Sequence, residues 1–158
     1  MISDVDGTIT KSDVLGHLLP RFGKDWSHDK VCALFEKIHN NGYQMLYLTA
    51  RAIGQAETTK NYIESLKQEN LKLPPGPIVM SPDRLLRSFS REIILKKPQV
   101  FKIACLSNIR QLYPHGFDPF YAGFGNRETD AISYRDVGVP LGKIFIINPD
   151  GEVHHYES

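Results

Sequence analysis

The stretch MISDVDGTIT, residues 1–10, determines the expected fold and suggests the chemistry of this chain. Residues 1–6 are predicted to form a short strand, in which residues two apart point to the same side. Asp4 and Asp6 therefore converge where the strand ends, and Gly7 allows the backbone to turn sharply away. Two adjacent carboxylates repel each other, so this pattern predicts a cation between them.

The type of cation and the type of reaction follow from the oxygen chemistry of the pair. Carboxylate oxygens are the ligands that Mg²⁺ prefers, which makes Asp4 and Asp6 candidate metal ligands. An aspartate carboxylate can also attack phosphorus and form an aspartyl-phosphate. The alternative is a solvated turn without chemistry, because Asp and Gly are common turn residues.

Composition restricts the class of protein further. The chain has 158 residues, which suits one domain, and its net charge of +1 argues against a strongly basic nucleic-acid arm. Cys32 and Cys105 lack CxxC spacing, so we expect buried free thiols in a reducing compartment. No apolar run approaches the ~20 residues of a membrane span, and no signal peptide is visible. We expect a single domain over residues 1–158 that is truncated at both ends; the short first strand indicates this for the N-terminal end.

The remaining chain alternates between strand and helix patterns. Apolar stretches predict strands, and apolar residues at helical spacing predict the intervening helices. This order predicts a three-layer α/β/α fold with a parallel sheet of about five strands and helices on both faces. The predicted strands after the first are 43–50, 76–81, 118–125 and 143–148, with an edge strand near 152–156; the predicted helices are 31–38, 55–69, 82–97, 98–112 and 128–137. In the helix from Pro98, we expect Phe101, Cys105, Ile109 and Leu112 to line the core face.

Further candidate site residues follow the other predicted strands, and ligands bind at the carboxyl ends of such sheets. Thr49 and Arg51 follow the second strand, Lys97 precedes a helix that begins with proline, and Asn126 and Asp130 follow the fourth. A hydroxyl, an ammonium and a carboxylate there could hold a phosphate and complete a Mg²⁺ site. Each signal is weak alone, because strand ends, helix ends and first helical turns favour these residue types anyway.

Taken together, these motifs resemble the haloacid dehalogenase phosphatase superfamily. More narrowly, the stretches ISDVDGTITKSDVLGHLLPRFGKDW, LTARAIGQA, LPPGPIVMSPDRL, REIILKKPQVFK and FYAGFGNRETDAISYRDVGVP resemble the catalytic C-terminal region of the lipins, the LNS2 domain. That resemblance covers almost the whole chain. It implies a Mg²⁺-dependent phosphatase that converts phosphatidate to diacylglycerol and phosphate at a membrane surface.

The resemblance also implies a role for each motif residue. Asp4 would be the nucleophile, and Asp6 the general acid and base. The other implied roles are metal binding by Asp4, Asp6 and Asp130, phosphate binding by Thr49, Lys97, Asn126 and Arg51, and support by Gly7 and Thr8; Lys102 is the alternative to Lys97. The segments 7–28 and 52–96 leave no room for a large cap domain, so we expect an open site.

The implied partner is phosphatidate at a membrane surface rather than a nucleic acid, and the separate N-terminal lipin region is absent from this chain. We therefore expect a cytoplasmic protein that is peripheral at the endoplasmic reticulum or nuclear membrane, or nuclear. Leu18 and Leu19, in the stretch after the nucleophile, would either dip into an anionic bilayer or pack on the domain. Three alternatives stay open: a related domain that binds phosphatidate without hydrolysis, which the presence of Asp6 disfavours, a capless phosphatase acting on protein or polynucleotide phosphates, and an inert fragment that has intact motifs but too little sheet edge to fold.

Overall fold

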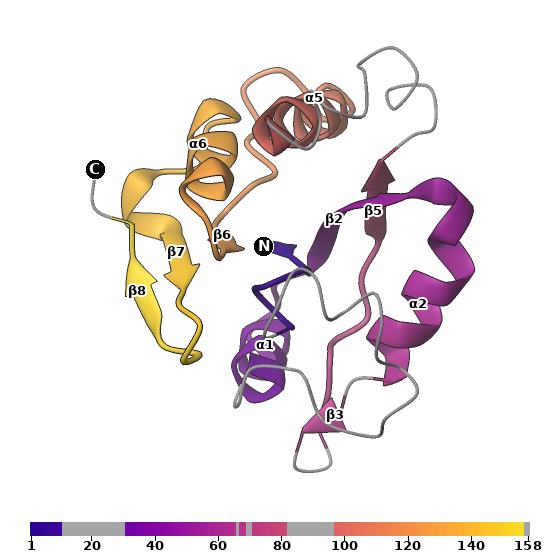
Figure 1. The fold of residues 1–158 in the computed structure, drawn as a ribbon. Helices are drawn as coiled ribbons and strands as arrows, with labels where there is room; N and C mark the ends of the chain where they lie inside the picture. Colours follow the sequence, from indigo (N-terminus) through magenta and orange to yellow (C-terminus); the bar gives the residue numbers. More distant parts are fainter. Residues whose placement is uncertain (11–30, 66, 69–70, 82–96, 157–158) are drawn as a thin grey trace.

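A six-stranded sheet forms the centre of the molecule (Figure 1). The structure, a computed structural model, describes residues 1–10, 31–65, 67–68, 71–81 and 97–156. Its strand order is β5-β2-β1-β6-β7-β8; the first five of these run parallel, and β8 pairs antiparallel with β7. The strands are β1 (Ile2–Asp4), β2 (Leu46–Ala52), β5 (Ile78–Ser81), β6 (Gly123–Gly125), β7 (Ile144–Ile147) and β8 (Val153–His155).

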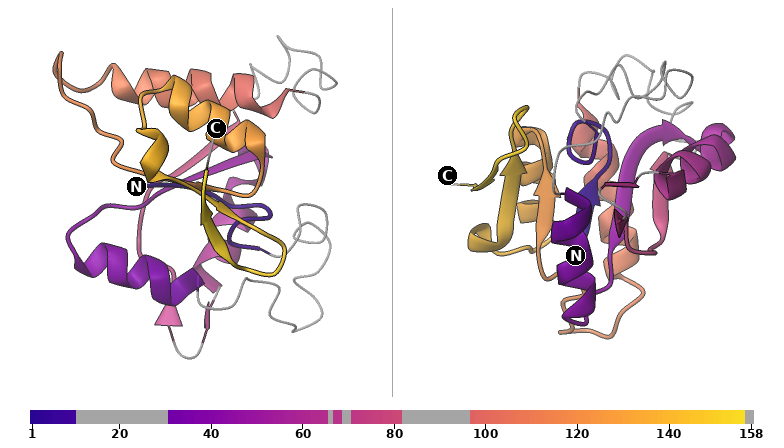
Figure 2. Two further views of the ribbon diagram at one scale, coloured as in Figure 1. Left: turned by 90° about the vertical axis from the view of Figure 1, so that its left-hand side faces the viewer. Right: turned by 90° about the horizontal axis from the view of Figure 1, so that it is seen from below.

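Helices cover both faces of this sheet (Figure 2). On one face lie α5 (Pro98–Arg110) and α6 (Glu128–Asp136), and on the other lie α1 (Val31–Asn40) and α2 (Ala56–Ser65). Three shorter features complete the described part: the 3₁₀ turns η2 (Ile53–Gln55) and η3 (Leu141–Lys143), and a small hairpin of β3 (Lys67–Gln68) and β4 (Leu71–Lys72).

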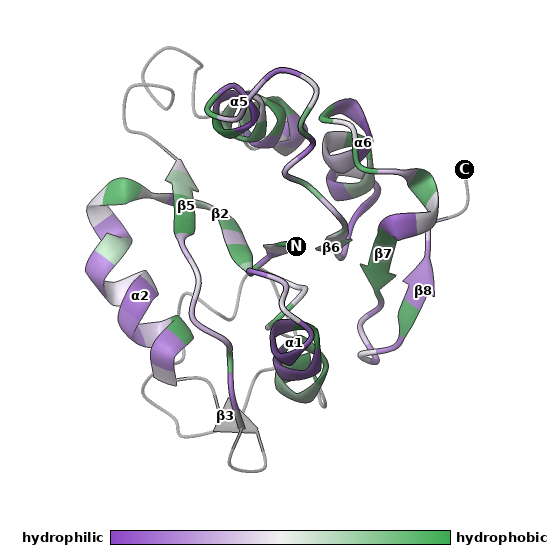
Figure 3. Ribbon diagram, turned by 180° about the vertical axis from the view of Figure 1, so that it is seen from behind, coloured by the Kyte–Doolittle hydropathy of each residue, from purple (hydrophilic) through white to green (hydrophobic). Residues whose placement is uncertain are grey.

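Alternating side chains of the strands build a separate apolar core under each pair of helices. Leu48 packs with Phe101 and Leu106 on the α5 and α6 face, whereas its neighbour Tyr47 packs with Phe35 on the α1 and α2 face. Because both faces are covered, apolar residues dominate much of the strands, as along β7, whereas polar residues such as Asp4 and Thr49 lie where β1 and β2 approach the carboxyl edge (Figure 3). The central position of β1 holds it rigidly, although it has only three residues.

The expected α/β/α fold class is confirmed, and so is the burial of the thiols of Cys32 and Cys105, neither of which is in a disulfide. Three local expectations were wrong. α2 ends at Ser65 instead of continuing to residue 69, and the strand before Gly125 is shorter than 118–125. Leu112 is 82% exposed because α5 ends at Arg110, so it does not line the core. The predicted helix 82–97 falls mostly on residues 82–96, which, with Leu18 and Leu19, lie outside the described residues.

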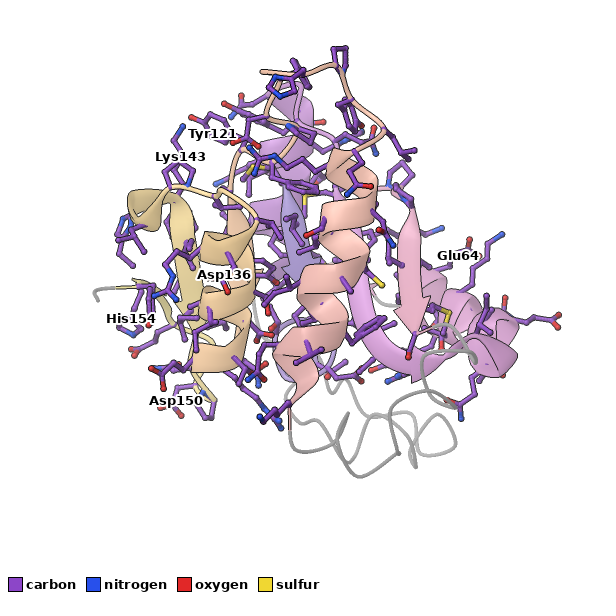
Figure 4. The ribbon with its side chains drawn as sticks, turned by 90° about the horizontal axis from the view of Figure 1, so that it is seen from above. Glu64, Tyr121, Asp136, Lys143, Asp150 and His154 are labelled. Atoms are coloured by element: carbon purple, nitrogen blue, oxygen red, sulfur yellow. The ribbon has the colours of Figure 1, made fainter. Side chains whose placement is uncertain are left out.

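The amino edge of the sheet carries an exposed aromatic and basic group. Lys143 Nζ lies 3.6 Å from the ring centroid of Tyr121, and the two side chains lie together at one end of the molecule (Figure 4). The ring centroids of Tyr43 and Tyr121 are 4.7 Å apart. Each of these residues precedes a strand, so this group marks the edge opposite the carboxyl ends. None of the helices in the described ranges has the length and apolar content needed to cross a lipid bilayer.

Candidate active site

Two carboxylates and one ammonium group converge at the carboxyl edge of the sheet. Asp4 comes from the end of β1, Lys102 from the first turns of α5, and Asp130 from the first turn of α6. Lys102 Nζ donates to Asp4 Oδ1 at 2.6 Å and to Asp130 Oδ1 at 2.5 Å. The three side chains are almost fully buried, with exposures of 6% for Asp4, 7% for Lys102 and 1% for Asp130. Water therefore screens these charges little.

The local sequence explains how α5 and α6 position Lys102 and Asp130 at the site. Lys102 lies on the same helical stripe as Phe101 and Cys105, so its ammonium group is carried into the core side of α5. On α6, Asp130 Oδ2 accepts hydrogen bonds from the backbone N–H groups of Asn126 and Arg127, at 3.0 and 3.1 Å. This fixes the carboxylate at the helix N-terminus, where a negative charge is favourable, and directs Oδ1 toward Lys102.

Close packing under Asp130 requires a residue without a side chain at the end of β6. A Cβ atom at Gly125 would lie 2.3 Å from Asp130 Cβ and 2.7 Å from Asp130 Oδ2. Two residues earlier in β6, a Cβ at Gly123 would lie 2.4 Å from the ring of Tyr134. Both glycines are therefore needed for α6 to approach the sheet closely enough to place Asp130 beside Asp4.

Burial strongly perturbs the titration of this cluster. Burial raises the pKa of Asp4, Lys102 lowers it again and Asp130 raises it, and the outcome is a value of about 7. For Lys102, burial lowers the pKa, but the two carboxylates outweigh this effect and the net shift is upward. The ammonium group therefore stays charged at neutral pH, while Asp4 exchanges a proton near neutrality. A group that titrates near the working pH and lies in a polar cluster is typical of a functional site.

A second polar cluster surrounds Asp6. Arg51 directs its guanidinium at this carboxylate, with Nη2 2.6 Å from Oδ1 and Nε 3.2 Å from Oδ1. Thr49 donates its hydroxyl to Asp6 Oδ2 at 2.9 Å, and Thr49 Oγ1 in turn accepts the backbone N–H of Arg51 at 3.2 Å. The Asp6 side chain is 16% exposed, so it remains accessible at the edge of the site.

The turn after Asp6 links the two halves of the site. Gly7 has a φ of +87°, a left-handed conformation that favours glycine, and its N–H donates to Thr10 Oγ1 at 3.0 Å. Thr8 is buried, and its hydroxyl donates to Asn126 Oδ1 at 3.4 Å. Asn126 thereby ties the loop after β1 to the loop after β6.

Most of the residues singled out in the sequence meet at this edge. Asp4 and Asp130 lie together, as do Asp6, Thr49 and Arg51, although Arg51 and Thr49 contact Asp6 rather than an open phosphate position. Lys97 is exposed and immediately precedes α5, whereas Lys102 reaches the two carboxylates. Lys102, the alternative to Lys97, therefore occupies this position, and phosphate binding by Lys97 stays a prediction. Helical spacing does not distinguish the two lysines, because Lys97 lies four residues before Phe101 and Lys102 lies three residues before Cys105; the direction of α5 relative to the sheet does.

The donor set at this edge fits a hard divalent cation. In the described residues, no three His, Cys, Asp or Glu side chains are grouped in a way that could hold a metal ion. Two carboxylates, Asp4 and Asp130, do converge, and the Asp6 carboxylate is held by Arg51 and Thr49. Backbone carbonyl oxygens and water commonly complete such a set for Mg²⁺. Asp6 could therefore contribute its main-chain oxygen rather than its carboxylate.

The fold and site define a Rossmann-like α/β protein with an acidic cluster at the carboxyl edge of a parallel sheet. The family model described as LNS2 (Lipin/Ned1/Smp2) matches residues 1–158, and the chain belongs to this family. This confirms the resemblance drawn from the motifs.

Several curated relatives match nearly the whole chain. Phosphatidic acid phosphohydrolase 1 of Saccharomyces cerevisiae is 57% identical over 98% of this chain and 19% of its own length. Phosphatidate phosphatase PAH1 of Arabidopsis thaliana is 60% identical over 97% of this chain and 17% of its own length. Phosphatidate phosphatase LPIN3 of Homo sapiens is 55% identical over 97% of this chain and 18% of its own length. The chain thus spans about a fifth of the length of these relatives.

Proposed function

We propose that this chain carries the catalytic centre of a Mg²⁺-dependent phosphatidate phosphatase, which releases diacylglycerol and inorganic phosphate. The observation that carries the proposal is the buried Asp4–Lys102–Asp130 cluster at the carboxyl edge of the sheet. The names of the three relatives supply the substrate class. The proposed location is the surface of the endoplasmic reticulum or nuclear membrane, where phosphatidate would be the partner.

The reaction would begin at Asp4. Its carboxylate attacks phosphorus, a bond forms between an Asp4 oxygen and phosphorus, and the bond from phosphorus to the diacylglycerol oxygen breaks. Asp6 donates a proton to that leaving oxygen, then accepts one from the water that hydrolyses the aspartyl-phosphate. Lys102 would compensate the negative charge of the phosphate group, since its ammonium is already placed beside Asp4.

Asp4, Asp130 and the main-chain oxygen of Asp6 would hold Mg²⁺. When bound, the ion would offset the charge that otherwise repels a phosphate from a carboxylate nucleophile. Thr49 and Asn126 are the remaining candidates for contacts with phosphate oxygens. In this proposal, Lys102 takes the role first predicted for Lys97.

The test is phosphate release by the 158-residue chain from phosphatidate in mixed micelles, with and without Mg²⁺. Release that requires both Mg²⁺ and Asp4, by comparison with Asp4→Asn, would support the proposal. A phosphoserine peptide and a 5′-phosphorylated oligonucleotide serve as parallel substrates. Faster release from either of them than from phosphatidate would replace the lipid by that substrate class. Binding of phosphatidate without release would identify a non-catalytic lipid-binding domain.

A further inference from the structure

Tyr62 of α2 belongs to none of the motifs that form the site, yet it reaches the site through Arg51. Its ring lies under the guanidinium group, with 5.3 Å from Arg51 Cζ to the ring centroid. Arg51 in turn binds the carboxylate of Asp6 through Nη2 and Nε. A helix on the surface of the sheet is thus connected to Asp6 by one cation–π contact and one ion pair.

We propose that Tyr62 is a positioning residue of this active site: its ring holds the guanidinium of Arg51, which in turn fixes the carboxylate of Asp6. The inference rests on the proposed function, in which Asp6 protonates the leaving oxygen. In this proposal, Arg51 binds the carboxylate of Asp6 rather than the phosphate group of the substrate.

The physical basis is the shape of the guanidinium group. Arginine is planar, and its edge carries the N–H donors, so the face remains available when the edge binds a carboxylate. The Arg51 side chain is only 6% exposed, and a cation–π contact is strongest when it is shielded from water. Tyr62 itself is anchored, because it packs against the core cluster that contains Ile63 and Tyr47.

Removal of the ring would leave the orientation of Asp6 underdetermined. Thr49 contacts only Oδ2, whereas Arg51 contacts both carboxylate oxygens and so determines the plane of the group. Arginine has a long side chain with several rotatable bonds, and its rotamers regain freedom once the ring no longer packs against it. A general acid must lie within hydrogen-bond reach of the atom it protonates, so a less ordered Asp6 transfers its proton less efficiently.

Two substrates with different leaving groups distinguish a defect in proton donation from weaker phosphate binding. The diacylglycerol oxygen is an alkoxide and needs a proton as its bond to phosphorus breaks. A 4-nitrophenolate leaves without one, because its negative charge is delocalised. A defect in proton donation therefore affects an alkyl phosphate far more than an aryl phosphate. Weaker phosphate binding would affect both alike.

The experiment compares Tyr62→Leu with Tyr62→Phe, which keeps the aromatic ring and loses only the hydroxyl. Each variant is assayed on dioctanoyl phosphatidate and on 4-nitrophenyl phosphate. For Tyr62→Leu, we expect kcat/KM, which reports only the steps up to departure of the leaving group, to fall about ten-fold on phosphatidate and to change less than about two-fold on the aryl ester. Tyr62→Phe should retain both rates. Equal losses on the two substrates, a loss in KM alone, or no loss would overturn the proposal.

A second measurement does not depend on activity. The Nε–H resonance of Arg51 is assigned in ¹⁵N NMR spectra by its disappearance in Arg51→Lys. Its exchange with water should be faster in Tyr62→Leu than in the wild type and in Tyr62→Phe; equal exchange rates in all three would refute the contact. If the wild type hydrolyses neither ester, the proposed function fails, while this exchange measurement still decides the role of Tyr62.

Discussion

Replacement of Lys102 by methionine tests the central arrangement of charges. The substitution keeps an unbranched apolar side chain but removes the ammonium that donates to Asp4 at 2.6 Å and to Asp130 at 2.5 Å. Because these groups are nearly fully buried, their charges would then repel each other with little screening. Loss of one partner of a buried ion pair destabilises a protein by about 3–5 kcal/mol, so we expect a large decrease in the free energy of unfolding.

The decrease should depend on pH in a defined direction. Asp4 has a pKa of about 7 in the folded chain, and loss of the neighbouring cation raises that pKa further. Protonation of Asp4 relieves the repulsion more completely at pH 6 than at pH 8, so Lys102→Met should be more destabilising at pH 8. Removal of a preorganised charge at a reacting centre also lowers kcat by about 10²–10³-fold.

The matched control is Lys97→Met, which removes an exposed lysine five residues earlier. Urea denaturation at pH 6 and pH 8 measures the free energy of unfolding, and phosphate release from phosphatidate measures kcat. Lys97→Met should match the wild type in both assays. The reasoning is refuted if Lys102→Met retains wild-type kcat, or if Lys97→Met loses as much activity and stability as Lys102→Met.

Four further outcomes follow from the structure. Gly125→Ala should lower activity at least about ten-fold and destabilise the fold by about 1–3 kcal/mol, because its Cβ would lie 2.3 Å from Asp130 Cβ. Gly54→Ala, which has open space around it, is the control in the same melting and activity assays. Mg²⁺ should raise the melting temperature more at pH 8 than at pH 6, because protons compete with the ion for Asp4 below its pKa of about 7. Calorimetric scans at equal ionic strength measure this difference, and a larger effect at pH 6 would contradict the prediction. Without Mg²⁺, Asp4 binds its proton more tightly in the folded than in the unfolded chain, so its contribution to stability is present below pH 4 and should decline as pH rises to about 7. Tyr134→Phe removes a 2.7 Å hydrogen bond from the buried hydroxyl to the backbone oxygen of Phe124. It should lower the free energy of unfolding, measured by urea denaturation, by about 0.5–1.5 kcal/mol. An unchanged midpoint would show that this hydrogen bond is energetically neutral.

The sequence was most informative where periodicity and motif spacing agree. Asp4 could be placed at a strand end, and Asp130 could be placed at the same edge from the strand order; Asp6 lies at this edge too, but in the turn after β1 rather than on the strand predicted over residues 1–6. The apolar stripe through Phe101 and Cys105 located α5 correctly. These features depend on local backbone geometry, which a sequence pattern records directly.

Contacts between side chains could not be predicted from the sequence in the same way. Lys97 and Lys102 both lie near the start of α5, and only the direction of the helix relative to the sheet decides which one reaches Asp4. The contact between Arg51 and Asp6 joins residues 45 positions apart, and no local pattern encodes it. The hairpin that follows α2 was likewise missed, because polar residues such as Lys67 and Gln68 carry no apolar period that separates helix from strand.

The place of β1 in the sheet has a consequence for folding. Ile2 pairs with Leu46 on one side and with Gly123 on the other, so the strand that carries the nucleophile is completed by two segments far apart in the chain. Contacts of long sequence separation form late, because loop-closure entropy must be overcome first. A partly folded chain with β1 and β2 already paired would lack Asp130. On refolding, recovery of the site should therefore lag behind recovery of the helices, and partly assembled chains would have no phosphate-handling chemistry.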